Sequence, residues 1–139
     1  MANWCGTSRS NYFRVKDAEA FKKWAYAARL GYFQQHGFFS INGQLTGDGY
    51  WPSQKTVENE DGSEDEVDFD VVEELPEHLA EGEVAVLMSS GAMKLQAVTG
   101  EATAVTWDGR TIAMSLNDIY EQAATEFGVP ENSITKAEY

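Results

Sequence analysis

The chain has 139 residues, 42% of them hydrophobic and 12% aromatic, and a formal net charge of −13. This length suits one domain with a modest core, and the apolar and aromatic content excludes a globally disordered protein. No apolar run exceeds the length of residues 84–88, which is far too short to span a bilayer, and no signal-peptide pattern opens the chain. We therefore expect a cytoplasmic protein.

The charge is unevenly distributed. Residues 1–55 carry seven Lys or Arg and three Asp or Glu, a net +4, whereas residues 56–139 carry three and twenty, a net −17. Between Lys55 and Lys94 there is no Lys or Arg. Such a field repels nucleic acid and anionic membranes and attracts cationic surfaces. We therefore expect a basic protein as the partner, without direct binding to nucleic acid or to a membrane.

The first third of the chain predicts a strand, a helix and a hairpin. Residues 11–15 (NYFRV) are rich in β-formers. Asp17 is a favoured N-cap and Gly31 a favoured terminator, which predicts a helix between them. Its apolar face has residues at helical spacing: Phe21, Trp24, Ala25 and Ala28. Asn42-Gly43 then predicts a hairpin turn, because both residues tolerate positive φ.

The stretch ENEDGSEDEVDFD, residues 58–70, has eight carboxylates in thirteen positions and no Lys or Arg. Residues 55–64 lack apolar periodicity, and we expect a mobile acidic loop there. After it, apolar and acidic residues alternate with a period of two, which predicts a strand. The apolar side chains would point inward and the carboxylates outward: Val67, Phe69 and Val71 against Glu66, Asp68 and Asp70.

An antiparallel meander is expected after the acidic stretch. Pro76 suits the first turn of a short helix over residues 76–81, which Gly82 ends. The strands are predicted at residues 83–89, at residues 95–107 with a bulge at Gly100, and at residues 110–115. A two-residue turn at Asp108-Gly109 would place Val105 opposite Ile112, and Trp107 opposite Arg110 as a stacked pair.

A helix is expected near the end of the chain. Capping residues at 115–118 begin it, and Gly128 with Pro130 ends it. Its buried face is predicted to hold Ile119, Tyr120, Ala123, Ala124 and Phe127. Residues 134–139 would add a short edge strand. Together the elements predict a single compact α+β domain over residues 1–139, with a mostly antiparallel sheet, two main helices and one short helix.

The carboxylates do not have the spacing of a metal site. An EF-hand loop beginning at Asp61 needs Gly at its sixth position and Glu at its twelfth, where this chain has Glu66 and Val72. His36 and His78 lack partners at ligand spacing for a transition metal. We therefore expect no metal and no cofactor.

No nucleophile motif or phosphate-binding loop occurs in the chain. The lone Cys5 excludes an internal disulfide and fits a reducing compartment. An enzyme built from scattered acids would need a deep pocket that holds a carboxylate of raised pKa. We therefore expect a protein that is not an enzyme.

The acidic residues suit a basic partner site. Alternate carboxylates on a strand lie about 6.6–6.8 Å apart, close to two phosphate steps of DNA at about 3.4 Å each. Arg binds carboxylate and phosphate in the same bidentate geometry. Tyr50-Trp51 beside a Gly-rich turn would add interface anchors, unless they pack in the core. The candidate partner-binding residues are Glu58, Glu60, Asp61, Glu64, Asp65, Glu66, Asp68, Asp70, Glu73, Glu74, Glu77, Tyr50 and Trp51.

A short, strongly acidic α+β chain with ENEDGSEDEVDFD resembles the small phage and plasmid proteins that block host defence, of the anti-CRISPR and antirestriction classes. The segments SNYFRVKD and SLNDIY also resemble mobile-element proteins. The resemblance implies a nucleic-acid mimic that inhibits a host enzyme, and it assigns no individual residue. The basic helix with Lys22, Lys23 and Arg29 departs from a mimic whose whole surface is acidic, so mimicry here would be one-sided.

The leading interpretation is a non-enzymatic binding or inhibitor protein whose acidic face engages the basic site of a nucleic-acid-binding protein. Two alternatives stay open. In the first, the +4 part of one copy binds the −17 part of another, which gives a structural or self-assembling homo-oligomer. In the second, the acidity only keeps the protein soluble.

Overall fold

The computed structural model describes residues 4–93 and 97–137. The helices are α1 (Ala18–Ala27), α2 (Val71–Glu74) and α3 (Asp118–Phe127), with 3-10 turns η1 (Leu75–His78) and η2 (Glu131–Ser133). The strands are β1 (Trp4–Ser10), β2 (Gly31–Gln35), β3 (Phe38–Asn42), β4 (Gln54–Glu58), β5 (Glu64–Asp68), β6 (Val84–Met93), β7 (Ala97–Thr106) and β8 (Thr111–Ser115).

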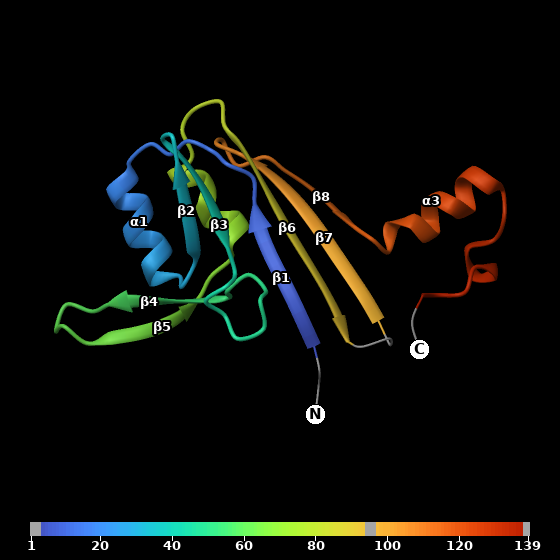
Figure 1. Ribbon diagram of the computed structural model, residues 1–139, viewed down its shortest axis with the longest axis horizontal. Coiled ribbons are helices and arrows are strands. Elements are labelled where there is room, and N and C mark those ends of the chain that lie inside the picture. Colours follow the sequence, from blue (N-terminus) through green and yellow to red (C-terminus); the bar gives the residue numbers. More distant parts are fainter. Residues whose placement is uncertain (1–3, 94–96, 138–139) are drawn as a thin grey trace.

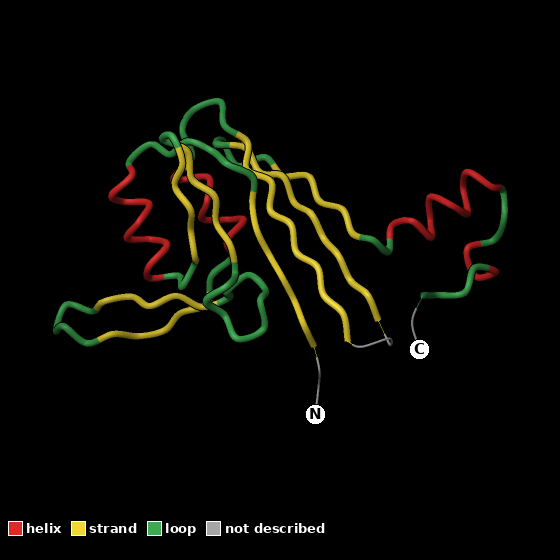
Figure 2. The backbone as a smooth tube through the Cα atoms, in the orientation of Figure 1, coloured by secondary structure: helices red, strands yellow, loops and turns green. Residues whose placement is uncertain are grey.

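Six strands form one antiparallel sheet in the order β2-β3-β1-β6-β7-β8, and β4 pairs with β5 in a separate two-stranded sheet. Figures 1 and 2 show the large sheet running across the middle of the molecule, with α1 at one end and α3 beyond the other. The predicted α+β class with mostly antiparallel pairing is confirmed. No helix in the described part of the chain is long and apolar enough to cross a membrane.

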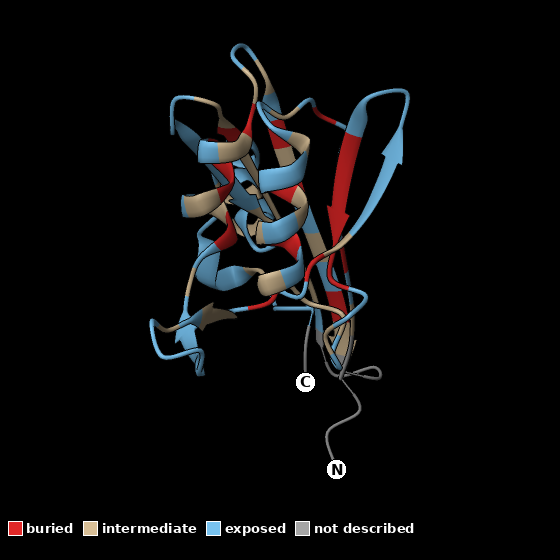
Figure 3. Ribbon diagram, turned by 90° about the vertical axis from the view of Figure 1, so that its left-hand side faces the viewer, coloured by how far each residue is buried: buried red, intermediate tan, exposed pale blue. Residues whose placement is uncertain are grey.

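The core lies between one face of the large sheet and the helices α1 and α2. Phe21 of α1 is fully buried, and its ring centroid lies 6.0 Å from that of Phe13 and 4.8 Å from that of Phe39. Ala85 of β6 and Val105 of β7, which face each other in the register, are also fully buried. Figure 3 shows the contrast between the buried strand β3 and the exposed edge strand β2.

The helix α1 begins at its predicted N-cap, since the Asp17 carboxylate accepts hydrogen bonds from the backbone N–H groups of residues 19 and 20. It ends before the predicted Gly31. Arg29 takes the left-handed conformation with φ 58°, and the Leu30 N–H donates to the Ala25 carbonyl at 2.8 Å. This is the Schellman arrangement with Arg in the place that Gly usually takes, stabilised by burial of Leu30 against the core.

The N-terminal strand was not predicted, and the strand expected at residues 11–15 is wrong. β1 covers Trp4–Ser10 and pairs with both β3 and β6, while Phe13 and Val15 make only isolated bridges. The inward positions of β1 are polar, which hid the strand from the hydrophobic pattern. Ser8 and Ser10 are buried, and their hydroxyls donate to backbone carbonyls at 2.7 and 2.8 Å.

The first hairpin turns at His36-Gly37, not at Asn42-Gly43 as predicted. His36 has φ 53° and Gly37 has φ 84°, so both central residues are left-handed, as a type I′ turn requires. Asn42 is the last residue of β3, and its side chain accepts a hydrogen bond from the Gln44 N–H at 3.1 Å. The Asn-Gly signal therefore marks the end of a strand.

The register of β7 with β8 differs from the prediction by one residue. Val105 pairs with Thr111, and Ile112 pairs with Ala104. The loop has three residues and ends at Gly109, whose φ of 90° fits the left-handed position that closes such loops. Because a shift of one residue exchanges the two faces of a strand, Ile112 lies on the opposite face from Val105. The predicted contact between Arg110 and Trp107 is present: the guanidinium carbon of Arg110 lies 5.9 Å from the centroid of the Trp107 ring.

Several element boundaries in the second half also differ from the prediction. The short helix begins at Val71, because the Asp70 carboxylate caps it by accepting from the Val72 N–H at 2.9 Å. Pairing is continuous through Gly100, so the predicted bulge is absent there. The predicted start of β7 at Leu95 lies outside the described residues. Residues 134–137 form no strand, and residues 138 and 139 are not described.

The helix α3 ends at Gly128 with φ 66°, as predicted. Its predicted burial is wrong: none of its described residues is buried, and Ile119 and Phe127 are 58% and 77% exposed. Figures 1 and 2 show why, since α3 extends beyond β8, away from the rest of the molecule.

Candidate functional site

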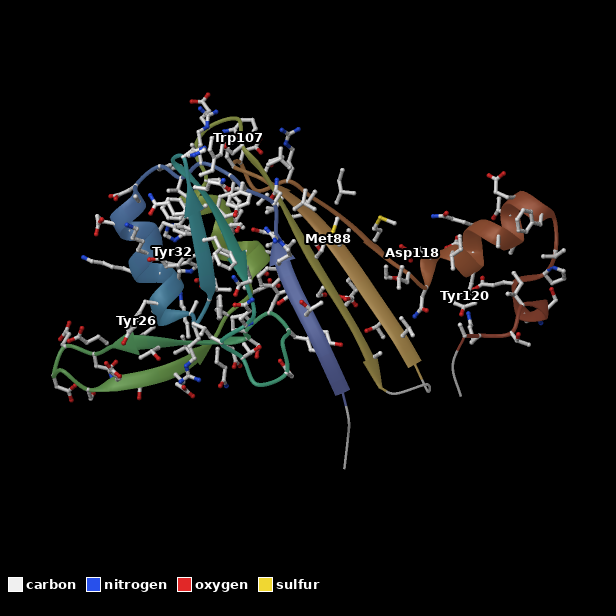
Figure 4. All side chains as sticks on the ribbon, in the orientation of Figure 1. Tyr26, Tyr32, Met88, Trp107, Asp118 and Tyr120 are labelled. Atoms are coloured by element: carbon white, nitrogen blue, oxygen red, sulfur yellow. The ribbon has the colours of Figure 1, made fainter. Side chains whose placement is uncertain are left out.

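The acidic stretch forms a hairpin that stands apart from the large sheet. We name β4, β5 and their turn, residues 54–68, the acidic hairpin. Figure 1 shows it extending to one side below α1, and Figure 4 shows oxygen-tipped side chains along its length. Every residue of β5 is exposed. The exposed carboxylates of the hairpin belong to Glu58, Glu60, Asp61, Glu64, Asp65, Glu66 and Asp68.

Part of the predicted loop at residues 55–64 is a strand. β4 reaches Glu58, and Glu58 pairs with Glu64, so the turn comprises only residues 59–63. The reason is local pairing rather than apolar burial. Lys55 faces Val67 across the ladder, and Val57 faces Asp65. These cross-strand pairs form a strand without the alternation of apolar and polar residues on which the prediction depended.

The turn at the tip has a defined geometry. The Asn59 N–H donates to the Ser63 carbonyl at 2.7 Å, and Gly62 takes φ 87°. The Ser63 hydroxyl and N–H both donate to the Asp61 carboxylate, and these hydrogen bonds hold the pKa of Asp61 below its usual value. The Asn59 amide donates to Asp65 at 2.9 Å. Hydrogen bonds thus fix the positions of Asp61 and Asp65 at the tip, and they favour the ionised form of Asp61.

The row of alternate carboxylates faces α1. Pairing places Glu64, Glu66 and Asp68 on the same face as Glu58, because opposite residues of a ladder share a face. This face lines one wall of an open groove of about 1010 Å³. The other wall comes from α1 and the segment after it and includes Lys22, Tyr26 and Arg29.

Arg29 forms an ion pair with Glu66 across this groove. Among the described residues, it is the only ion pair that a carboxylate of the acidic hairpin makes. Arg29, which follows α1, thus neutralises the middle of the row, while Glu58, Glu60 and Glu64 have no ion-pair partner in the described part of the chain. The free negative charge is concentrated toward the tip.

The predicted anchoring of this strand by its apolar residues is only partly right. Phe69 packs against the core, but Val67 is exposed, and Val71 belongs to α2. Asp70 accepts a hydrogen bond as the cap of α2, so the row ends at Asp68. The chain turns into a helix at Asp70 because a carboxylate there can cap, and the alternation of residue types did not show this.

Glu74 is bound inside the protein and is not part of the exposed acidic surface. It accepts a hydrogen bond from the Trp24 indole at 2.9 Å and two from the Lys55 ammonium at 2.7 Å. Partial burial opposes ionisation, but these hydrogen bonds hold the pKa of Glu74 below its usual value. Because Lys55 forms its ion pair with Glu74 at the base of the hairpin, it does not neutralise the carboxylates at the tip.

The remaining candidates lie outside the acidic hairpin. Glu73 and Glu77 are exposed on α2 and η1. Trp51 packs against the core, which supports its alternative reading as a packing residue. Tyr50 is half-buried beside Gly6 of β1, where any side chain on residue 6 would meet the tyrosine ring. The structure therefore brings seven of the thirteen candidates together on one hairpin.

His78 has a structural setting. Its ring stacks on Trp24 with centroids 4.8 Å apart, and Phe21 lies against its edge at 6.2 Å. Burial in this aromatic setting lowers the pKa of His78, and the nearby Glu77 and Glu74 oppose the shift. No group of three or more metal-ligating side chains occurs among the described residues.

The chain was compared with protein-family models, with curated proteins and with solved structures, and none of them matches it. The acidic hairpin and its surroundings are therefore interpreted from geometry and charge.

Proposed function

We propose that this chain is a binding protein whose acidic hairpin engages a cationic site on a protein partner, of the kind that binds nucleic acid. The proposal rests on one observation: the hairpin projects and is exposed, and Glu66 is the only one of its carboxylates with an ion-pair partner among the described residues. The strand spacing of about 6.6–6.8 Å between alternate carboxylates matches about two phosphate steps. The hairpin would thus occupy the place of a nucleic-acid strand.

The shape of the hairpin favours insertion. Two paired strands that project from the body can enter a groove of the partner that is lined by Lys and Arg. Carboxylates on a flat sheet face would contact only the rim of such a groove. The hydrogen-bonded turn arranges the tip carboxylates in advance, which reduces the conformational entropy lost on binding. The association should be fast and strongly dependent on salt, because it is electrostatic.

A retention experiment tests the proposal. The immobilised protein is exposed to cell extract at low salt, and the bound proteins are eluted with increasing salt or with duplex DNA. We expect nucleic-acid-binding proteins in the eluate, released by duplex DNA at a concentration at which an uncharged polymer releases nothing. Retention that neither salt nor duplex DNA changes would contradict the proposal.

A charge-driven homo-oligomer ranks second. Three cations from the first 55 residues already form ion pairs with later carboxylates of the same chain: Arg14 with Glu83, Arg29 with Glu66, and Lys55 with Glu74. These pairs reduce the positive charge available to a second copy. Inhibition of a host defence enzyme, as the resemblance implies, is a narrower version of the proposal and would require that the partner's activity be blocked.

A further inference from the structure

We name the face of the large sheet opposite the core the outer face, and no helix in the described part of the chain packs on it over β6, β7 and β8. Because side chains alternate between faces, the register places Val84, Met88 and Val98 on it. Ile112 and Met114 of β8 lie on the same face. In a chain with 24% charged residues, no charged side chain occupies a described outward position of these three strands.

The outer face is also strongly exposed. Met88, Ile112 and Met114 are 56%, 77% and 58% exposed, and Figure 4 shows Met88 on the open side of the sheet. A groove of about 390 Å³ runs over this surface and is lined mainly by apolar groups, among them Met88, Ala102, Met114 and Leu116. Contiguous apolar surface of this kind marks an interaction site in a soluble protein.

The helix α3 also exposes an apolar surface. Ile119, Ala123 and Phe127 follow each other at intervals of four residues and form one apolar stripe. Ile119 and Phe127 are exposed, and no described residue of α3 is buried. The contacts that α3 does make are with the residues that follow it: the Tyr120 hydroxyl accepts from the Ala137 N–H at 2.6 Å, and the Lys136 ammonium lies 3.9 Å from the Tyr120 ring centroid. They leave the apolar stripe exposed, and a ten-residue helix with so little packing is marginal in water, so α3 needs a further surface on which to pack.

The local geometry directs α3 away from the outer face of its own chain. The Leu116 N–H donates to the Gly100 carbonyl at 2.9 Å, and the Ser115 N–H donates to the Asp118 carboxylate at 2.8 Å. The Leu116 side chain covers Gly100 so closely that a Cβ there would lie 2.9 Å from it. Only Leu116 and Asn117 separate β8 from α3. A return of α3 across β8 would break these contacts.

We propose that two copies of this chain form a closed dimer in which α3 of each copy packs on the outer face of the other. Ile119 and Phe127 would fill the groove beside Met88 and Met114. The exchange is reciprocal, so it closes at two copies and leaves no free arm. The dimer contains two such contacts, and each need bury only about 800 Å² to give a standard interface of about 1,600 Å².

The charges agree with this packing. α3 carries three carboxylates, Asp118, Glu121 and Glu126, and neither Lys nor Arg. The outer face has no outward carboxylate on its described strand positions, and the groove is lined by one cation, Arg9 beside Met88, and by one carboxylate, Glu101, whose position on β7 faces inward. Because the contact is mainly apolar, the dimer should persist at high salt, unlike the binding proposed for the acidic hairpin.

Sedimentation equilibrium over a range of protein concentrations tests the proposal. We expect a species with the mass of two chains at both low and high salt. Phe127→Ser and Met114→Ser should each weaken dimerisation by about tenfold or more, because each removes a large apolar contact. Both side chains are exposed in the single chain, so its folding should tolerate the changes. Tyr26→Ser, which removes an equally exposed aromatic from α1, is the matched control and should have no effect.

Cross-linking distinguishes the possible occupants of the outer face. In a Cys5→Ser background, a chain with Ala123→Cys on the α3 stripe and Ala102→Cys in the groove keeps Phe127 and Met114, and it is oxidised and separated without reductant. Exchange of α3 predicts dimers joined by disulfides between the two chains. An α3 that folds back on its own chain predicts linked monomers, that is, single chains with an internal disulfide. The proposal is overturned by linked monomers, by a protein that stays monomeric at all concentrations, or by a dimer that Phe127→Ser leaves unchanged.

Discussion

Glu74 shows that one carboxylate of an acidic chain can serve the fold instead of the surface. Its contacts with Trp24 and Lys55 join α1, β4 and α2, and both members of the Lys55–Glu74 pair are about three-quarters buried. A buried acceptor that loses its charge leaves its donors poorly satisfied. We therefore expect Glu74 to contribute to the free energy of unfolding rather than to binding.

We predict that Glu74→Gln lowers the free energy of unfolding by about 1–3 kcal/mol at pH 7. Because the pKa of Glu74 in the folded protein lies below the ordinary 4.5, its contribution is present above about pH 4.5 and is lost as the pH falls through the folded value. Urea unfolding of the variant and of Glu73→Gln, an exposed neighbour, measures this. A loss as large in Glu73→Gln as in Glu74→Gln would contradict the assignment.

His78 should add a second acid-dependent step at higher pH. Its lowered pKa means that the unfolded chain binds a proton that the folded chain resists, so the free energy of unfolding falls as the pH drops from about 6.5 toward the folded value. His78→Phe keeps a ring against Trp24 and should remove this step. His36→Asn, which changes the other histidine, should keep it. Thermal unfolding between pH 7.5 and pH 5 checks both, and a step that survives His78→Phe refutes the prediction.

At the scale of single elements, the β2–β3 turn can be improved. His36 takes φ 53°, which costs a residue with a bulky side chain more than it costs Asn. We predict that His36→Asn raises the free energy of unfolding by about 0.4–1 kcal/mol, since it gives the Asn-Gly pair that type I′ turns favour. Gln35→Asn, on the adjacent strand residue, is the control and should not stabilise the protein. Equal effects of the two changes would show that the turn conformation is not the cause.

The elements that sequence reasoning predicted are those whose local signals agree with their packing. Asp17 caps α1, and the apolar face of α1 is buried. Both features were predictable because a cap and a helical spacing depend only on residues close together in the sequence. β1 was missed because Ser8 and Ser10 take buried positions by hydrogen bonding, and no hydrophobic pattern reports that. The β7–β8 register was missed because one extra loop residue cannot be read from Asp108-Gly109 alone.

The candidate site was predictable in charge and not in shape. An acidic surface at residues 58–68 follows from composition, but its form as a projecting hairpin depends on the pairing of β4 with β5. Lys55 and Glu58 of β4 are residue types that are depleted in strands, so the sequence gives no strong strand signal there. Glu74 and Asp70 accept hydrogen bonds within the protein and so do not belong to the row of free carboxylates; for Glu74 this depends on donors far along the chain, and for Asp70 on the start of a helix. The exposed stripe of α3 carries the same local pattern as a buried one, so its exposure could not be foreseen.

At the scale of the whole molecule, the charge of −13 should destabilise the fold at low salt through repulsion. We predict that raising the salt concentration increases Tm by about 2–4 °C, the shift that about 1 kcal/mol produces near this chain length. The triple change Glu58→Gln, Glu60→Gln and Glu64→Gln should reduce that salt dependence, because it removes clustered charges that form no ion pair within residues 4–93 and 97–137. A Tm that falls with salt would contradict this account.

We propose that the acidic hairpin, and not the acidity of the chain in general, recognises the cationic partner. The most direct measurement compares two triple variants of equal net charge −10: Glu58→Gln, Glu60→Gln and Glu64→Gln in the hairpin, against Glu81→Gln, Glu126→Gln and Glu131→Gln elsewhere. Each is immobilised, and the nucleic-acid-binding protein that duplex DNA displaces is quantified. We predict at least a tenfold loss of retained partner for the hairpin variant and near wild-type retention for the control. Equal retention by the two variants would contradict the claim.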